Sequence, residues 1–296
     1  MSEFSQATLK ANGLSFSALE QGEGELVLCL HGFPDHNRSW RHQLPALAEA
    51  GYRAVAPMLR GYEPSSQPRD GDYHVVRMAE DVVGWLDHMG VEKCHLVGHD
   101  WGAIIGYATA ALAPDRFHSL STIAVPHLRR MPQGLRKDPG QVLNSWYMLF
   151  FQLRLISDYI VEFNDFAFIE KLWRDWSPGW DYPKGEMEAL KDTFRAEGVK
   201  RAALGYYRAF FDAVSPAARE TRKLTSAKIQ VPTLAITGAT DGCMDTVLYD
   251  LVMLEDDFPA GLQVVRISGG GHFVQQEKPA EVNKFLIEWI KEHSPA

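Results

Sequence analysis

The pentapeptide Gly98-His99-Asp100-Trp101-Gly102 constrains the fold of this chain more than any other stretch. The run 93–97, typical of a buried strand, precedes it, and the run 103–112, typical of a buried helix, follows it. A sharp strand-to-helix turn with glycine two residues before and two residues after a central polar residue is the nucleophile elbow pattern. Such a turn strains its central residue, and only very small neighbours avoid collision. The pattern therefore predicts a nucleophile at Asp100.

The identity of the central residue restricts the bond that it could attack. An aspartate side chain is ionised at neutral pH, so Asp100 needs no base to become a nucleophile. Its attack on an acyl group would give a reactive anhydride, whereas attack on a saturated carbon gives an ordinary ester. Aspartate therefore favours carbons with a strained or good leaving group, such as epoxides and alkyl halides. The alternative is that Asp100 only caps the following helix.

Length and charge narrow the classes of protein to consider. The chain has 296 residues, 46% of them apolar, which is enough for one large α/β domain with an inserted subdomain. Its net charge is −8 and no cluster of Lys or Arg occurs, so we expect neither nucleic acid nor a membrane as a partner. The N-terminus lacks the layout of a signal peptide, and no apolar run approaches ~18 residues. We expect a cytoplasmic enzyme.

The three cysteines indicate a reduced protein. Cys29 and Cys94 fall in expected buried strands, and Cys243 falls in an expected loop. An odd count without a spacing motif argues against a disulfide framework or a zinc site. We expect all three to be small apolar fillers.

Strand-like and helix-like segments alternate in the first half of the chain. Residues 7–20 are expected to form two short strands that turn at Asn12-Gly13. Alternation of strands and helices indicates a largely parallel sheet whose active site lies at the carboxyl ends of its strands. Further strands are expected at 25–30, 52–57, 93–97 and 120–125 (with a start as early as Phe117), and helices at 39–50, 75–89 and 103–112.

Between about 129 and 221 this alternation stops. The segment lacks strand-like runs and is rich in helix formers and aromatic residues. A helical insertion over the active end of a sheet would act as a lid and wall an apolar pocket. We therefore expect an α/β core, residues 1–128 and 222–296, and a helical lid (cap), residues 129–221.

After the insertion, strands are expected at 231–237 and 262–267, and a helix at 280–292 closes the chain. Asp241 and His272 each lie just past the carboxyl end of one of these strands. The order nucleophile, acid, histidine is the order of the α/β-hydrolases.

The chemistry of the two side chains gives Asp241 and His272 different expected roles. Asp241 could accept a hydrogen bond from one ring nitrogen of His272 and leave the other nitrogen to take a proton from water. Three glycines before His272 suit a side chain that must approach other backbone. Asp245, four residues after Asp241, is a competing acid, but Asp241 lies nearer to the strand end.

A backbone hydrogen-bond donor is expected opposite Asp100. The strand at 25–30 runs directly into His31-Gly32-Phe33-Pro34, in which a glycine followed by X-Pro forces a tight turn. The N–H of Phe33 would then complete an oxyanion hole with the N–H of Trp101. The plainer alternative is a simple strand-to-helix loop.

Four motifs together resemble those of the epoxide hydrolases of the α/β-hydrolase fold. The likeness covers nearly the whole chain and is dense from 28 to 125 and from 231 onward. It implies a mostly parallel sheet flanked by helices, and conversion of an epoxide to a vicinal diol through a covalent aspartyl ester. The motifs are His31-Gly32-Phe33-Pro34, Arg60-Gly61-Tyr62, Gly98-His99-Asp100-Trp101-Gly102 and Gly271-His272-Phe273.

The resemblance also implies roles for tyrosines of the lid. In the family, two lid tyrosines donate hydrogen bonds to the epoxide oxygen and assist ring opening. Tyr147 falls on the first position, and Tyr207 best fits the second, with Tyr206 as a close rival. The implied catalytic set is Asp100, His272, Asp241, Tyr147 and Tyr207, with Phe33, Trp101 and Tyr206 at the substrate.

The expected partners are a small apolar epoxide and water, with a homodimer left open. No metal or organic cofactor is needed for this chemistry.

The sequence departs from the family at Met58, where many relatives have aspartate, and at Glu63, where glycine is common. Both positions lie in a loop away from the inferred chemistry, so they bear on the shape of that loop.

Haloalkane dehalogenases carry similar motifs and are the alternative. Many of them have a halide-binding asparagine where this chain has Phe33, whose side chain cannot donate a hydrogen bond. Fluoroacetate dehalogenases carry arginine after the nucleophile, where this chain has Trp101. Two tyrosines and the lack of a halide or carboxylate clamp favour an epoxide. A non-catalytic receptor on this fold is disfavoured because all three catalytic positions are filled.

Overall fold

The chain begins with the hairpin that the Asn12-Gly13 signal predicts. In the computed structural model, which describes residues 4–295, β1 (Ser5–Ala11) pairs antiparallel with β2 (Leu14–Gln21). Both turn residues have positive φ, 51° and 75°, as a two-residue hairpin turn requires. β2 also pairs antiparallel with β4 (Tyr52–Pro57), and so joins the hairpin to the rest of the sheet.

The remaining strands of the sheet are parallel. The strand order is β1-β2-β4-β3-β5-β6-β7-β8, and every pairing from β4 to β8 is parallel. β5 and β7 are buried along their whole length because helices cover both faces of the sheet. The predicted α/β fold is confirmed. The added strands are β3 (Glu25–Leu30), β5 (Cys94–His99), β6 (Phe117–Ile123), β7 (Thr233–Gly238) and β8 (Leu262–Ile267).

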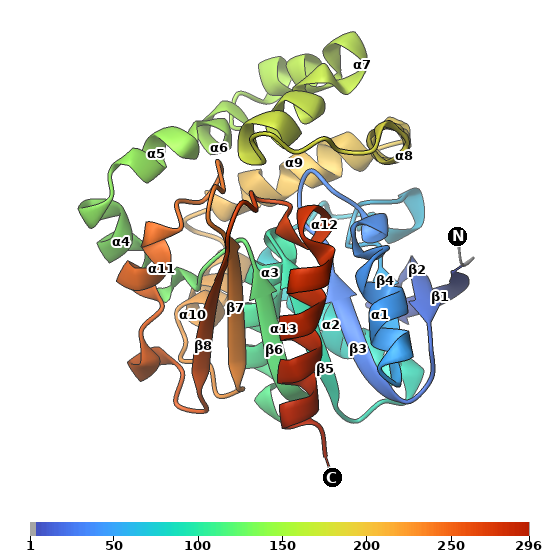
Figure 1. Cartoon of the computed structure of the whole chain (residues 1–296). Coiled ribbons are helices and arrows are strands. Elements are labelled where there is room, and N and C mark those ends of the chain that lie inside the picture. Colours follow the sequence, from blue (N-terminus) through green and yellow to red (C-terminus); the bar gives the residue numbers. More distant parts are fainter. Residues whose placement is uncertain (1–3, 296) are drawn as a thin grey trace.

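Helices form a layer on each side of the sheet (Figure 1). One layer contains α1 (Gln43–Glu49) and α13 (Pro279–His293), which contact each other. The other contains α2 (Val75–Met89), α3 (Trp101–Leu112) and α10 (Pro216–Thr225), which also pack on one another. Two separate apolar clusters fill the spaces between the sheet and these layers.

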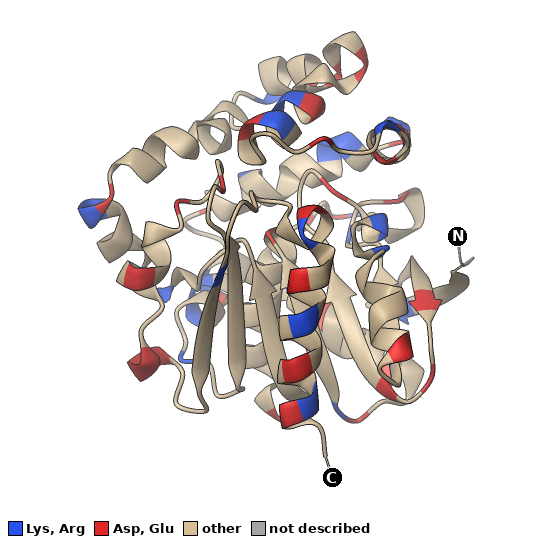
Figure 2. Ribbon diagram, viewed as in Figure 1, with Lys and Arg blue, Asp and Glu red and all other residues tan. Residues whose placement is uncertain are grey.

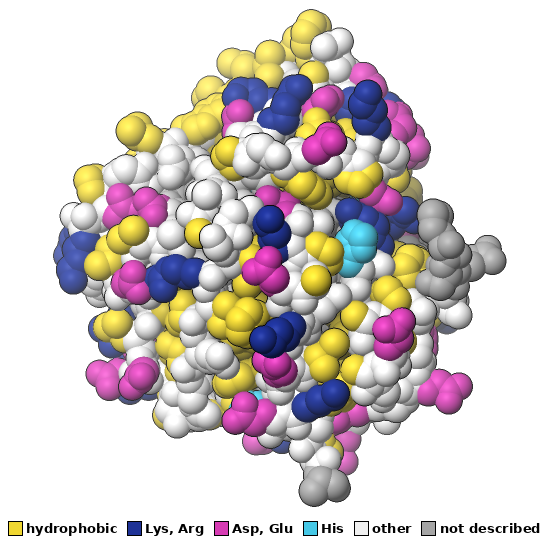
Figure 3. All heavy atoms as spheres, in the orientation of Figure 1, with side chains coloured by type: hydrophobic (Ala, Val, Ile, Leu, Met, Phe, Trp, Pro, Cys, Tyr) yellow, Lys and Arg dark blue, Asp and Glu magenta, His cyan; other side chains and the backbone are white. Residues whose placement is uncertain are grey.

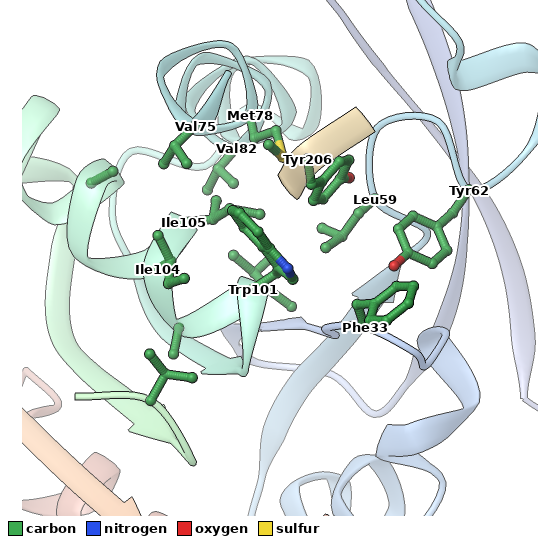
Figure 4. Packing of buried hydrophobic residues seen from close by; sticks show 14 of the residues in the cluster. Phe33, Leu59, Tyr62, Val75, Met78, Val82, Trp101, Ile104, Ile105 and Tyr206 are labelled. Atoms are coloured by element: carbon green, nitrogen blue, oxygen red, sulfur yellow. The ribbon is translucent and has the colours of Figure 1, made fainter. Parts of the chain in front are cut away.

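The layer of α2 and α3 continues into the region above the sheet. Figure 4 shows Val75, Met78 and Val82 of α2 beside Ile105 and Trp101 of α3, within one buried cluster. Burial of such side chains contributes about 1.5–3 kcal/mol each relative to exposure, so this cluster fixes the start of α3 firmly against the core.

Above the carboxyl edge of the strands, the chain between β6 and β7 forms a helical insertion (Figure 1). Its longest helix, α7, is interrupted at residues 163–166, where three residues have positive φ. The helical insertion consists of α4 (Met131–Lys137), α5 (Gly140–Asn144), α6 (Trp146–Phe150), α7 (Arg154–Trp176), α8 (Lys184–Arg195) and α9 (Val199–Phe210).

Two boundaries differ from the sequence-based expectations in an informative way. The expected border between residues 221 and 222 falls inside α10, which packs on α2 and α3 of the core. The expected helix over 39–50 is a 3-10 turn followed by the shorter α1. Pro45 accounts for the late start, because proline has no N–H for an intrahelical hydrogen bond and is tolerated only in the first turn.

Short elements complete the chain. They are the helices α11 (Val247–Val252) and α12 (Val274–Glu277) and the 3-10 turns Asn37–Trp40, Pro64–Ser66, Pro114–Arg116, Leu128–Arg130 and Glu255–Asp257. Charged residues of both signs are interspersed over the helices of the core (Figure 2). Within residues 4–295 we find no helix whose length and hydropathy would let it cross a bilayer.

Candidate active site

Asp100 lies at a strained turn between β5 and α3. Its backbone has φ 53° and ψ −116°, a combination that is unusual for a residue other than glycine. A Cβ added at Gly98 would lie 2.2 Å from the Gly102 carbonyl oxygen, and one added at Gly102 would lie 2.2 Å from the Leu30 carbonyl oxygen. Both glycines are therefore required by close backbone approach. Although Asp100 precedes α3, its side chain makes no capping hydrogen bond.

The two carboxylate oxygens of Asp100 have different neighbours. The backbone N–H of Phe33 donates to Oδ1 at 2.7 Å. Oδ2 lies 3.6 Å from Nε2 of His272. Gly32 makes the first contact possible, because a Cβ there would lie 2.4 Å from Cβ of Asp100. The loop after β3 thus brings a backbone donor to Asp100, as the sequence predicted.

His272 and Asp241 form a buried pair beside Asp100. Nδ1 of His272 lies 3.0 Å and 3.2 Å from the two carboxylate oxygens of Asp241. The N–H groups of Cys243 and Met244 donate to Asp241 Oδ1 and hold the carboxylate in place. Asp245 instead accepts a hydrogen bond from the N–H of Val247. Of the two candidate acids, the structure places Asp241 at the histidine.

The electrostatic environment of His272 favours its protonated form. Burial alone would lower the pKa of this imidazole, but the carboxylates of Asp241 and Asp100 outweigh that effect and raise it to about 10. Nε2 has no hydrogen-bond partner among residues 4–295. His272 can therefore hold a proton next to Asp100 while Asp100 is charged.

Two tyrosines of the helical insertion face Asp100 across a cavity. Tyr147 of α6 and Tyr207 of α9 both line this cavity, and their rings lie 5.6 Å apart. The Tyr207 hydroxyl is buried and has no hydrogen-bond partner in the described part of the chain. Burial raises the pKa of both hydroxyls well above their ordinary value, so both are neutral donors.

Tyr206 points away from the cavity. Its hydroxyl donates to the carbonyl oxygen of Arg60 at 2.6 Å, and its ring packs against Trp101 and Tyr62; Figure 4 shows the three side chains together. Successive residues of a helix point about 100° apart, so only one of two adjacent tyrosines can face the cavity. Tyr206 is therefore not placed for the expected substrate contact, whereas Tyr207 lines the cavity.

Phe33 also differs from expectation in its side chain. Only its backbone N–H approaches Asp100, while the ring is fully buried against Phe151, Phe194 and Tyr207 and does not line the cavity. Trp101 does line the cavity, as predicted. The cavity has a volume of about 340 Å³, and of the described residues that line it Asp100 alone is charged.

Comparison with known proteins places this arrangement in a family. Residues 25–279 match a family model described as the alpha/beta hydrolase fold. The chain is 32% identical to an epoxide hydrolase of Caballeronia sordidicola, over 96% of this chain and 92% of that protein. It is 31% identical to epoxide hydrolase A of Mycobacterium tuberculosis, over 94% and 95% of the two chains. The chain belongs to the epoxide hydrolase family of the α/β-hydrolase fold.

Solved structures of epoxide hydrolases share the whole architecture. The crystal structure of an epoxide hydrolase from Vigna radiata superimposes with a TM-score of 0.84 at 29% identity, over 99% of each chain. An epoxide hydrolase from Bacillus megaterium in complex with an inhibitor gives a TM-score of 0.83 at 29% identity, over 96% of this chain and all of that one. Membership of this family favours an epoxide as the substrate over an alkyl halide, the substrate of the dehalogenase alternative.

A thiol at this epoxide hydrolase site was missed by the sequence reasoning. Cys243, expected to be a filler, lines the cavity, and its Sγ lies 3.3 Å from the Tyr147 hydroxyl. Burial raises the pKa of the thiol well above its ordinary value, so it is neutral. Its position two residues after Asp241 was the one sequence signal that could have placed Cys243 at the site. Cys29, Cys94 and Cys243 are all free.

The end of α7 fastens the helical insertion to both loops that carry Asp241 and His272. The carbonyl oxygen of Trp176 accepts hydrogen bonds from the N–H groups of Gly242, at 2.9 Å, and His272, at 3.0 Å. No sequence pattern pointed to this residue, because a backbone carbonyl carries no signature of residue type.

Ser177 and Glu277 bind the backbone N–H groups of the residues before and after His272. The Ser177 hydroxyl accepts from the N–H of Phe273 and donates to Glu277 at 2.6 Å. The other carboxylate oxygen of Glu277 accepts from the N–H of Gly271 at 2.9 Å. Sequence reasoning missed both side chains.

Within residues 4–295, no three His, Cys, Asp or Glu side chains are grouped so that they could hold a metal ion.

Proposed function

We propose that this protein hydrolyses an epoxide to a vicinal diol through a covalent ester on Asp100. The observation that carries the proposal is the convergence on one cavity of the Asp100 carboxylate and two neutral tyrosine hydroxyls, with His272 3.6 Å behind the carboxylate. A carboxylate nucleophile, donors for the departing oxygen and a base are the groups that two-step opening of an epoxide needs.

In the first step, Asp100 attacks one epoxide carbon from the side opposite to the C–O bond that breaks. Since the Phe33 N–H binds Oδ1, the attacking atom is Oδ2. Tyr147 and Tyr207 donate hydrogen bonds to the epoxide oxygen, and one of them supplies its proton as the C–O bond breaks. The product is a hydroxyalkyl ester of Asp100.

In the second step, His272 acts as a base. Esterification removes the charge of Asp100, which is one of the two carboxylates that raise the pKa of His272, so the imidazole releases its proton to solvent and regains one from solvent when the Asp100 carboxylate is restored. His272 takes a proton from water, and the hydroxide attacks the carbonyl carbon of the ester. The N–H groups of Phe33 and Trp101 stabilise the oxyanion. Of the two protons of the water, one ends on the diol and the other restores the tyrosine.

The cavity supports a neutral, apolar epoxide as the substrate. Its lining is mainly apolar, and Asp100 would repel an anionic substrate because no cation lines the wall. In this proposal the helical insertion is the lid that covers the reacting atoms, as expected for residues 129–221. A cytoplasmic location remains a prediction from the sequence, which cell fractionation would measure.

The decisive experiment is single turnover of a His272→Gln variant. We expect Asp100 to be alkylated and not released, so intact-protein and peptide mass spectrometry should detect a stable adduct equal to the mass of the epoxide. An Asp100→Asn variant is the matched control and should give no adduct. Rapid diol formation by His272→Gln would contradict the role of His272.

A second assay separates the proposal from the dehalogenase alternative. A styrene-type epoxide and a chloroalkane are supplied in parallel, and diol and halide are quantified. We expect diol without halide. Halide release without diol would contradict the proposal.

A further inference from the structure

The helical insertion exposes an unusual amount of apolar surface. Of the large hydrophobic side chains exposed in the described chain, all but Leu112, Val247 and Leu254 lie between residues 142 and 214. They fall on α5, α6, the first half of α7 with the residue before it (residues 153–163) and the segment 210–214, which we call the insertion face. Figure 3 shows hydrophobic side chains gathered at the top and upper left, where Figure 1 places α5, α6 and α7.

The insertion face is almost free of net charge. No Asp, Glu, Lys or Arg occurs in residues 139–153, and α5 and α6 are accordingly uncoloured in Figure 2. On α7, Asp158 pairs with Arg208 at 2.8 Å, and Glu162 pairs with Lys200. Both cations come from α9, so the acidic groups in this half of α7 are neutralised within the helical insertion. The other charged residues of the insertion face are Arg154 and Asp212, one of each sign. The net charge of −8 therefore resides mainly on other surfaces.

The insertion face is continuous with the cavity. Val142, Leu149, Phe210 and Phe211 are each more than a third exposed, and all four also line the cavity that contains Asp100. These four side chains thus belong both to the cavity wall and to the exposed apolar surface.

The size of this surface fits an interface between two proteins. The largest apolar patch of a typical monomer is roughly 300–600 Å². The exposed fractions of these side chains correspond to an area on the order of 1,000 Å² in total, whereas a stable interface needs about 800 Å² from each partner. The area is therefore sufficient for a stable complex and large for a surface left in water.

We propose that the insertion face is the contact surface of a homodimer. Two copies related by a twofold axis would bury identical uncharged faces, and their negatively charged surfaces would stay apart. A membrane fits less well, because surface-binding helices carry a face rich in Lys and Arg, whereas Arg154 is the one basic residue in the segments that form the insertion face. In the dimer, the openings of the two cavities lie beside the contact. This inference does not depend on the reaction that the site performs.

Sedimentation equilibrium of the full chain tests the proposal. We expect a dimer that dissociates only on dilution. A Leu155→Glu, Tyr159→Glu double variant should raise the dissociation constant at least about 100-fold, because it places charges in an apolar contact. Both side chains are strongly exposed, 88% and 64%, so the fold should tolerate these changes. Leu143→Asp, at a third exposed position, should act in the same direction if the double variant proves unstable.

Leu112→Glu is the matched control. Leu112 is 40% exposed at the end of α3, outside the insertion face, and this variant should dimerise as the wild type does. A wild-type protein that is monomeric from low micromolar to near-millimolar concentration would overturn the proposal, as would a dimer unaffected by the changes at 143, 155 and 159. A monomer that floats with phosphatidylcholine vesicles would assign the face to a lipid surface and also overturn it.

Discussion

Two adjacent tyrosines on α9 show how a single rotation along a helix separates a structural role from a chemical one. Tyr206 and Tyr207 are both buried, but the hydroxyl of Tyr206 is engaged by the Arg60 carbonyl, whereas that of Tyr207 is unpartnered at the cavity. The motif alone left both as candidates. The direction of α9 relative to the sheet, which depends on tertiary packing, decides between them.

Replacing each tyrosine by phenylalanine should separate these roles. We expect Tyr207→Phe to slow alkylation of Asp100 by about 100-fold, because one donor to the departing oxygen is lost. Tyr206→Phe should leave alkylation unchanged and lower the free energy of unfolding by about 1–3 kcal/mol, because the buried Arg60 carbonyl loses its partner. Stopped-flow measurement of alkylation and urea unfolding of both variants give the comparison. Faster alkylation by Tyr207→Phe than by Tyr206→Phe would refute the assignment.

The sequence predicted the positions of Asp100, Asp241 and His272 because each follows a strand, and parallel strands end at one edge of the sheet. It also predicted the Phe33 N–H, since Gly32 and Pro34 restrict that turn. It did not predict that the Phe33 ring is buried away from the cavity, because the direction of a side chain depends on neighbours that are distant in sequence.

At the scale of elements, the end of α7 links the helical insertion to the loops of the core. Trp176 holds the loops after β7 and β8 through its carbonyl, and Ser177 and Glu277 hold the peptides on both sides of His272. A helix of the helical insertion therefore helps to position a side chain of the core. This relation could not be predicted, because neither the bounds of α7 nor its packing follow from its aromatic composition.

Removal of the Ser177 hydroxyl should disturb the second chemical step selectively. We expect Ser177→Ala to slow hydrolysis of the Asp100 ester about tenfold and to leave alkylation unchanged, because only the loop of His272 is loosened. Rapid-quench kinetics resolve the two rates. Ser157→Ala is the control: Ser157 is also a buried serine of α7, but its hydroxyl bonds to groups within the helical insertion. Equal losses in both steps, or equal effects of the two variants, would contradict a positioning role.

At the scale of the whole molecule, one buried ion pair connects distant parts of the fold. Arg60, after β4, donates to both carboxylate oxygens of Asp81 on α2, at 2.7 and 2.8 Å. Asn12 of the hairpin turn also donates to Asp81, and the Arg60 carbonyl accepts the bond from Tyr206. The hairpin, a core helix and the helical insertion thus meet at the Arg60–Asp81 pair.

Asp81→Ala should destabilise the protein strongly. It leaves the buried Arg60 guanidinium without a counter-charge, which costs about 3–5 kcal/mol of unfolding free energy. Asp250→Ala is the control, because Asp250 pairs with Arg266 at an exposed site, where a loss below about 1 kcal/mol is expected. Urea denaturation followed by tryptophan fluorescence measures both. Similar urea midpoints for the two variants would show that the buried pair contributes no more to the free energy of unfolding than the exposed pair.

Most of the core could be predicted from the sequence, and most of the helical insertion could not. The alternation of apolar strands with amphipathic helices restricts the core to few topologies, and the predicted α2 has the observed bounds. The insertion has no comparable repeat, and its helices are arranged by contacts among aromatic side chains. The border near residue 221 missed α10 for the same reason, since its core contacts come from tertiary packing.

The shared acceptor at Trp176 matters for engineering by exchange of segments. A chimaeric protein that receives residues 142–175 from a relative keeps the two hydrogen bonds that the Trp176 carbonyl accepts and the hydrogen bonds of Gln141 to the loop of Asp241. It should therefore keep the placement of Asp241 and His272. A graft that extends through 176 and 177 replaces those anchors and should need compensating changes in the recipient. The cavity lining that α5 and α6 supply can therefore be varied upstream of this residue with the least disturbance to the loops of Asp241 and His272.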